Sequence, residues 1–171
     1  MDVLEAIHTR RSIRAFTDAP VSEADLDTIL RAAMTAPSAG NSQPWHFVVV
    51  TDRATLDAIP DIHSHAAMVR QAPLAIAVAA ELAQEKYQGF GYWTLDCSAA
   101  VENLLLAARA IGLGTVWCGI YPRPERMEGL SRLLSLPEGI KAHALVVVGH
   151  PAQEFKRVDR FKPERIHRDR W

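Results

Sequence analysis

Three arginines and a serine lie close together near the start of the chain, at Arg10, Arg11, Ser12 and Arg14. If the chain is extended there, side-chain alternation places Arg10, Ser12 and Arg14 on one side. A guanidinium group binds phosphate through two hydrogen bonds and stays charged at any working pH. The cluster therefore predicts capture of a phosphorylated ligand, with a solvated basic helix end, stabilised by the helix dipole, as the alternative.

A loop rich in turn-forming residues, Pro37–Pro44, carries a second set of polar groups. Ser38, Asn41 and Gln43 can donate and accept hydrogen bonds, while small neighbours would let a flat ligand approach the backbone. The loop could therefore recognise the polar edge of a ring. The same composition is also typical of an ordinary surface loop.

The segment Gly112–Ile120 is predicted to be a strand with small residues near its ends. Backbone N–H groups there could bind a ligand without obstruction by side chains. It lacks the Lys-Ser/Thr ending of a nucleotide-triphosphate loop and the three-glycine fingerprint of a dinucleotide site. ATP hydrolysis and a Rossmann-type NAD site are therefore disfavoured. A buried structural strand is the alternative.

Side chains that could act as catalytic acid, base, nucleophile or metal ligand are sparse. The seven histidines are scattered, and we expect His63 and His65 to be solvated on a polar loop rather than to bind a metal. Cys118 has no activating neighbour in the local sequence, and no G-x-S-x-G nucleophile motif is present. Binding groups without such a set are typical of a protein that leaves the chemistry to a cofactor.

The elements that must position these groups begin with two helices. Val3, Leu4 and Ile7 recur at helical spacing and predict a short helix that ends near the arginines. Ser22 is a good N-cap, and the helix after it should run to about Met34.

Four short apolar runs predict buried strands. A helix over Thr94–Ile111 has apolar residues on nearly every face, as in a core or an interface, and Gly112 should end it in a left-handed conformation. A last helix is expected from about Pro124 to Ser135. The strand runs are Trp45–Thr51, Leu74–Ala80, Gly114–Ile120 and Ala144–Val148, and the polar interruptions of the long helix are Asp96, Glu102, Asn103 and Arg109.

The composition limits the class of protein. The chain has 171 residues, of which 49% are hydrophobic and 23% charged, with a net charge of -1. These values predict one globular α+β domain over residues 1–171 and exclude collagen-like, disordered and disulfide-scaffold proteins. Cys97 and Cys118 are expected to be reduced, and no apolar run approaches the roughly 20 residues that span a bilayer. We expect a cytoplasmic protein with no membrane or metal partner.

The C-terminal segment is predicted to be an extended arm over residues 151–171. From Phe155 to Trp171 it carries seven Lys/Arg and three Asp/Glu, yet its apolar residues, among them Phe161 and Ile166, need partners. A second subunit or the arm's own domain could supply these partners. Nucleic-acid binding is disfavoured because no recognition motif accompanies the charge.

The order of four segments resembles the nitroreductase family of FMN-dependent flavoproteins, in its short version without large insertions. The segments are RRSIRAF, APSAGNSQPWHFVVV, GLGTVWCGIYP and VVVGHP before the basic tail, and together they cover essentially the whole chain. The resemblance implies a central, mixed but mostly antiparallel sheet flanked by helices. It also implies an intertwined homodimer with two FMN molecules in its interface and the arm on the partner subunit.

The resemblance also implies roles for individual residues. Arg10, Arg11, Ser12 and Arg14 would hold the FMN phosphate together with Arg160, for which Arg157 is a less favoured substitute. The loop residues Pro37, Ser38, Ala39, Asn41 and Gln43 would approach the flavin from the partner subunit. The backbone of Trp117, Cys118 and Gly119 would pack under the ring, with the N–H of Cys118 or Gly119 donating toward N5.

The implied activity is ping-pong hydride transfer from NADH or NADPH through flavin N5 to a small acceptor such as a nitroaromatic or a quinone. A flavin-binding module that senses or stores FMN is the alternative, and specialised chemistry such as dehalogenation or flavin breakdown would share the same motifs. Longer family members carry a helical insertion where this chain has only Glu81–Trp93, so substrate choice does not carry over. Aromatic residues of this span could line a channel or pack against the domain; they are Tyr87, Phe90, Tyr92 and Trp93.

Overall fold

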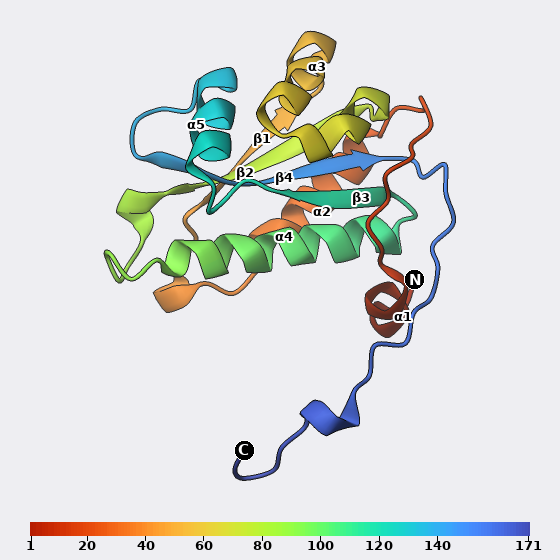
Figure 1. Cartoon of the computed structure of the whole chain (residues 1–171), viewed down its shortest axis with the longest axis vertical. Coiled ribbons are helices and arrows are strands. Elements are labelled where there is room, and N and C mark those ends of the chain that lie inside the picture. Colours follow the sequence, from red (N-terminus) through yellow and green to blue (C-terminus); the bar gives the residue numbers. More distant parts are fainter.

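The computed structural model describes all residues, 1–171, and its centre is a four-stranded antiparallel sheet (Figure 1). The strand order is β1-β2-β4-β3, so β1 and β3 form the edges and β2 and β4 the middle. An isolated bridge between Ser12 and Thr115 adds a parallel pairing beside β3. The expected mostly antiparallel sheet is thus confirmed, and the only parallel pairing is this isolated bridge. The strands are β1 Trp45–Val50, β2 Leu74–Glu81, β3 Gly114–Gly119 and β4 Ile140–Gly149.

Helices cover both faces of the sheet (Figure 1). The long helix α4 and α2 lie on one face, with α1 near the end of α4, whereas α3 and α5 lie on the other face. Short 3-10 segments occupy residues Ala39–Asn41, Ser64–Gln71, Leu82–Gln84 and Pro163–Arg165. The helices are α1 Val3–Thr9, α2 Glu23–Met34, α3 Arg53–Ile62, α4 Tyr92–Ala110 and α5 Pro124–Leu133.

Burial on both faces explains why the strands are apolar throughout rather than alternating. Along β2, Ile76 and Val78 face the core toward α4, whereas Ala75 and Ala77 face the core toward α3 and α5. All four are at most 1% exposed. The predicted burial is confirmed for β2 and β4, since a strand covered on both faces needs apolar side chains at every position, whereas the edge strands β1 and β3 are only partly buried.

The helix ends follow the local chemistry that the sequence indicates. The Ser22 hydroxyl accepts a hydrogen bond from the Asp25 N–H at 3.1 Å, which caps α2. After α4, Gly112 has a φ of 88°, and the Leu113 N–H donates to the Ala108 carbonyl at 2.8 Å. This left-handed ending matches the prediction. Helix α3, which begins after the cap residue Asp52, was not predicted.

The arm begins on its own domain and then leaves it (Figure 1). The Gln153 side-chain oxygen accepts hydrogen bonds from the N–H groups of Arg14 and Ala15 at 2.9 and 3.1 Å. Farther along, Phe161 is 70% exposed and Trp171 is fully exposed. Only the first part of the arm therefore packs on this domain, and its placement on a partner subunit stays a prediction.

Candidate functional site

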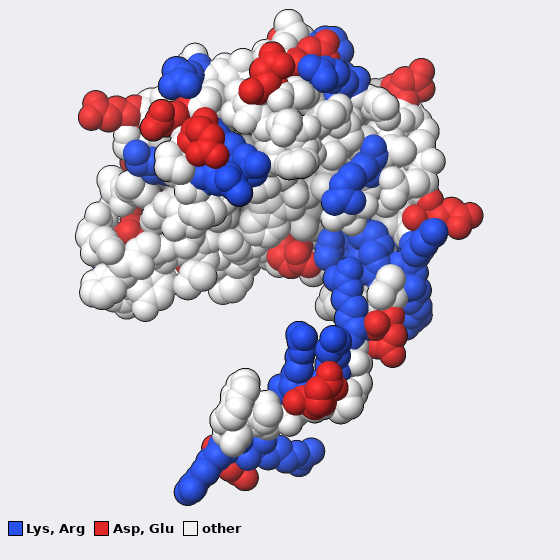
Figure 2. Space-filling model, viewed as in Figure 1, with Lys and Arg blue, Asp and Glu red and all other residues white.

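A basic hollow of about 770 Å³ lies where the arm passes α1. Figure 2 shows Lys and Arg side chains gathered at this junction. Arg10 is half-buried, and its Nε lies 3.3 Å from a carboxylate oxygen of Glu102 on α4. Arg11, Arg157 and Arg160 also line the hollow, together with one carboxylate, that of Asp159. The structure thus brings both arginines predicted from the tail close to two of the N-terminal cluster.

Arg11 is held almost entirely by backbone carbonyls. It donates to the carbonyl of Arg10, to that of His8 at 3.0 Å and to that of Val158 in the arm at 3.3 Å. Its Nε is buried without a partner. Burial, and then the neighbouring charges of Arg160 and Arg10, lower the pKa of Arg11. An anion in the hollow would relieve this repulsion.

Arg14 lies in a different hollow, of about 550 Å³, along the open edge of β3. Trp117, Cys118 and Gly119 line this second hollow, and Arg126 of α5 closes it from the other side. The predicted cluster is therefore divided, because Arg10 and Arg11 face one hollow and Arg14 the other. Ser12 sits between them, paired with Thr115 of β3.

The open edge of β3 fixes which backbone groups face the second hollow. The Thr115 carbonyl accepts from the Ile13 N–H at 2.8 Å, and the Gly119 carbonyl accepts from Arg126 at 2.8 Å. In an antiparallel ladder the N–H and C=O of one residue point to the same side, and the sides alternate. Trp117 and Gly119 therefore turn their N–H groups outward, whereas Cys118 pairs with Leu145 of β4. Of the two predicted donors, Gly119 has the free N–H.

His63 corrects the expectation of a solvated histidine. It is only 5% exposed, and its Nε2 lies 3.1 Å from a guanidinium nitrogen of Arg126. Burial, together with the charge of Arg126, lowers the pKa of His63. Since guanidinium can only donate, Nε2 accepts and the ring is neutral. His65 beside it is exposed, as expected.

The loop over Pro37–Gln43 lies elsewhere, beside the first turns of α4, whereas the basic hollow adjoins α1 and the arm near the other end of α4 (Figure 1). Pro37, Ser38 and Ala39 line a small hollow against Tyr92 and Asp96. One chain therefore does not bring the loop to either of the other hollows.

Asp96 is the residue that shapes this loop, and the sequence indicated it only as a polar interruption of the helix. It is 4% exposed, and its carboxylate accepts from the Ala39 N–H at 2.9 Å and from the Ser42 hydroxyl at 3.2 Å. Asn41 and Gln43 have positive φ values of 57° and 47°, which are uncommon for residues with a side chain. A fixed anchor is needed to hold such a conformation.

We expect Asp96→Ala to lower the free energy of unfolding by about 2 kcal/mol, because two part-buried donors lose a charged acceptor. Hydrogen exchange across residues 37–44 should rise at the same time. Asp96→Asn should keep most of the stability, since its oxygen can accept from Ala39 and its nitrogen can donate to Ser42. Urea unfolding and exchange mass spectrometry test this, and an unaltered loop in Asp96→Ala would refute the anchoring role.

A buried histidine, His143 of β4, joins the sheet to α4 behind Trp117. Its Nε2 lies 3.1 Å from the Ser98 hydroxyl, which itself donates to the Thr94 carbonyl at 2.6 Å. Nε2 must therefore carry the proton, and Nδ1 is a buried acceptor without a donor. Burial lowers the pKa of His143 to about 4. Aromatic rings of Trp93, Trp117 and Tyr121 surround it.

His143 should make stability depend on pH. Its pKa is about 4 in the folded chain against 6.5 unfolded, so below pH 6.5 only the unfolded state gains the proton. Stability is therefore full above pH 6.5 and falls by about 2 kcal/mol between pH 7 and 5. His143→Gln should flatten this slope in urea titrations, although His63 adds a smaller loss. His167→Gln on the exposed arm is the control, and an equal slope in His143→Gln would contradict the assignment.

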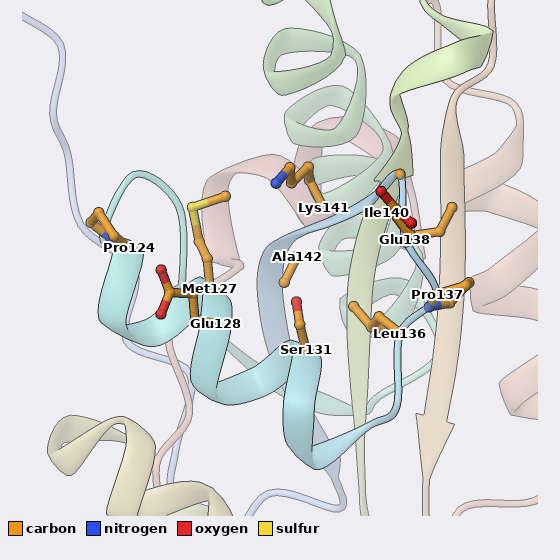
Figure 3. A pocket seen from close by; sticks show the side chains of 11 residues that line it. Pro124, Met127, Glu128, Ser131, Leu136, Pro137, Glu138, Ile140, Lys141 and Ala142 are labelled. Atoms are coloured by element: carbon orange, nitrogen blue, oxygen red, sulfur yellow. The ribbon is translucent and has the colours of Figure 1, made fainter.

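A further hollow lies apart from these residues, between α5 and the start of β4 (Figure 3). Its charged side chains, Glu128, Glu138 and Lys141, are all exposed, and it contains none of the predicted residues. No group of three or more His, Cys, Asp or Glu side chains could hold a metal ion. None of the helices combines the length and apolar character needed to cross a bilayer.

Comparison with known proteins identifies relatives over the whole chain. The model of the Nitroreductase family matches residues 7–67 and 61–150. A protein of Methanothermobacter thermautotrophicus, named "Putative NADH dehydrogenase/NAD(P)H nitroreductase", is 49% identical over 171 residues, which is all of this chain and 88% of that protein.

Solved structures agree with this similarity. A crystal structure from Parabacteroides distasonis, of a protein with the same name, has a TM-score of 0.93 and 38% identity, covering 99% of this chain and 98% of that one. A structure in complex with FMN from Desulfovibrio desulfuricans has a TM-score of 0.84 and 32% identity, covering 100% and 98%. The chain is thus similar to nitroreductases in both sequence and fold.

Proposed function

Since the chain belongs to the nitroreductase family, we propose that it is an FMN-dependent oxidoreductase that takes hydride from NADH or NADPH and passes it to a small acceptor. The acceptor class we propose is a nitroaromatic or a quinone. Bound FMN would supply the hydride-accepting ring, and the protein would supply binding, orientation and charge.

One observation carries the fit to FMN. The segment Arg10–Arg14 runs parallel to β3, paired at Ser12 and Thr115, so the path from Arg11 to Arg14 follows β3 toward Trp117. The basic hollow lies at the first end of this path, and the hollow with outward N–H groups lies at the second. A ligand with a phosphate at one end and a flat polar ring at the other matches this arrangement.

The residues of the β3 edge then have distinct tasks. The Gly119 N–H would donate to the ring, Trp117 would support it, and Arg14 would add positive charge. Neither His63 nor Cys118 is suited to moving protons, because His63 Nε2 already accepts from Arg126 and burial raises the pKa of the Cys118 thiol to about 11. Orientation and fixed charge are therefore what the protein contributes.

We also propose that two chains form the complete site. The loop at Asn41 and Gln43 is separated from both hollows of its own chain, so a second copy would have to bring it there. Exposed apolar side chains support an interface, among them Leu4 of α1, Leu95 of α4 and Ile166 of the arm, which are 60%, 64% and 58% exposed. Sedimentation tests this, and a stable monomer that retains FMN would overturn it. Two buried free thiols are in keeping with the reducing cytoplasm, where we place the protein.

The experiment that tests the function is anaerobic reduction of the bound flavin. The protein is loaded with FMN, the excess is removed, and bleaching is followed after NADH or NADPH is added. Rapid bleaching by either nicotinamide is expected. Retained flavin that neither nicotinamide reduces would favour the alternative, a module that binds FMN without turnover. Failure to retain flavin would refute the site.

A further inference from the structure

Arg126 belongs to α5, an element that carries none of the residues predicted for the site. Its guanidinium donates to the Gly119 carbonyl at 2.8 Å and lies 3.1 Å from His63 Nε2. His63 of the same chain is buried, and its Nε2 can only accept. It therefore accepts a hydrogen bond from the Arg126 guanidinium and holds it in place. Arg126 is therefore a half-buried cation tied to the last residue of β3.

Gly119 needs such a restraint because β3 is an edge strand. No neighbouring strand holds the outward groups of Gly119, and a Cβ at this position would meet nothing within 4 Å. A glycine in open space has more backbone freedom than any other residue. The hydrogen bond from Arg126 restrains the outward carbonyl of Gly119, on the same side as its free N–H.

Arg126 also adds charge to the same hollow. Both Arg14 and Arg126 line it, and neither forms an ion pair with a carboxylate. The other nitrogens of Arg126 make no hydrogen bond within the chain. Unpaired cations beside a ring stabilise its electron-rich, reduced form more than its oxidised form.

We propose that Arg126 is a positioning residue that orients Gly119 and makes the site bind reduced FMN more tightly than the oxidised form. The proposal rests on the proposed function, since it takes the second hollow as the place of the ring. It predicts a difference between two affinities rather than a general loss of binding.

The test measures the dissociation constants of oxidised and dithionite-reduced FMN under anaerobic conditions. In Arg126→Met we expect the constant for reduced FMN to rise about tenfold and that for oxidised FMN less than threefold. If the constant for oxidised FMN is unchanged, the ratio of the two constants changes tenfold, which corresponds to a reduction potential about 30 mV lower. Arg126→Lys keeps the charge and should restore most of the ratio. Arg123→Met removes an exposed arginine beside the same helix and should leave both constants unchanged.

The outcomes separate the inference from the proposed function. If the unaltered protein binds neither form of FMN, the proposed function fails. If it binds both and Arg126→Met weakens them equally, Arg126 has a structural role only and the inference is overturned. An equal change in Arg123→Met would assign the effect to net charge and would overturn it as well. Thermal unfolding of each apoprotein shows whether a variant is folded.

Discussion

Replacing Arg11 with alanine is expected to raise the dissociation constant of FMN about 30-fold, since one charge-assisted hydrogen bond contributes about 2 kcal/mol. The reason is that Arg11 lines the basic hollow, where a phosphate would offset the like charges of Arg10 and Arg160 and accept from the guanidinium. Riboflavin lacks the phosphate, so its affinity should be unchanged in the same variant. The comparison of the two flavins by fluorescence titration therefore isolates the phosphate contact.

The two hollows provide a contrast within this experiment. Arg14 lines the hollow of the β3 edge, so Arg14→Ala should weaken FMN and riboflavin by the same factor. Arg31→Ala is the matched control, because Arg31 is exposed on α2 and pairs only with Asp27. A loss of riboflavin affinity in Arg11→Ala would show that the arginine supports the fold rather than the phosphate. If Arg14→Ala weakens the binding of FMN but not that of riboflavin, Arg14 contacts the phosphate, as the sequence predicted.

The residues that interrupt α4 explain how much of the site the sequence could predict. An apolar helix interrupted mainly by four charged or amide side chains indicates burial, and each of these four side chains contacts another segment of the chain. Asp96 anchors the loop, Glu102 pairs with Arg10, Asn103 bonds the Ala32 carbonyl at the end of α2, and Arg109 bonds Thr9 of α1. The pattern predicts that these side chains need partners. Which partner each one finds depends on contacts 57 to 100 positions away in the chain.

The other face of the sheet shows why some functional residues were missed. Arg126 lies on a short amphipathic helix whose sequence is ordinary for a solvated surface, and His63 lies in a polar segment. Their contact joins positions 63 residues apart, and it exists only because α3, the following 3-10 segment and α5 pack together over the sheet. Local periodicity and capping predict elements well, as with α2 and α4. They carry no information about which exposed arginine will reach a backbone carbonyl of an edge strand.

Gly114 leaves no room for a side chain, and Gly114→Val is expected to destabilise the protein by about 3 kcal/mol. A Cβ at Gly114 would lie 2.8 Å from the Cγ2 atom of Ile13. Ile13 is fully buried, and its N–H is bonded to Thr115 of β3. The added side chain must therefore push the segment Arg10–Arg14 away from β3.

Displacing the segment Arg10–Arg14 should also alter the candidate site, because this segment contributes arginines to both hollows along β3. We therefore expect Gly114→Val to weaken FMN binding as well as to lower the urea midpoint. A double-mutant cycle with Ile13→Ala provides the control, since removing the clashing atoms should make the two losses less than additive. Additive losses would mean that the side chain added at position 114 acts somewhere other than on Ile13. In that case the register between this segment and β3 would not depend on the glycine.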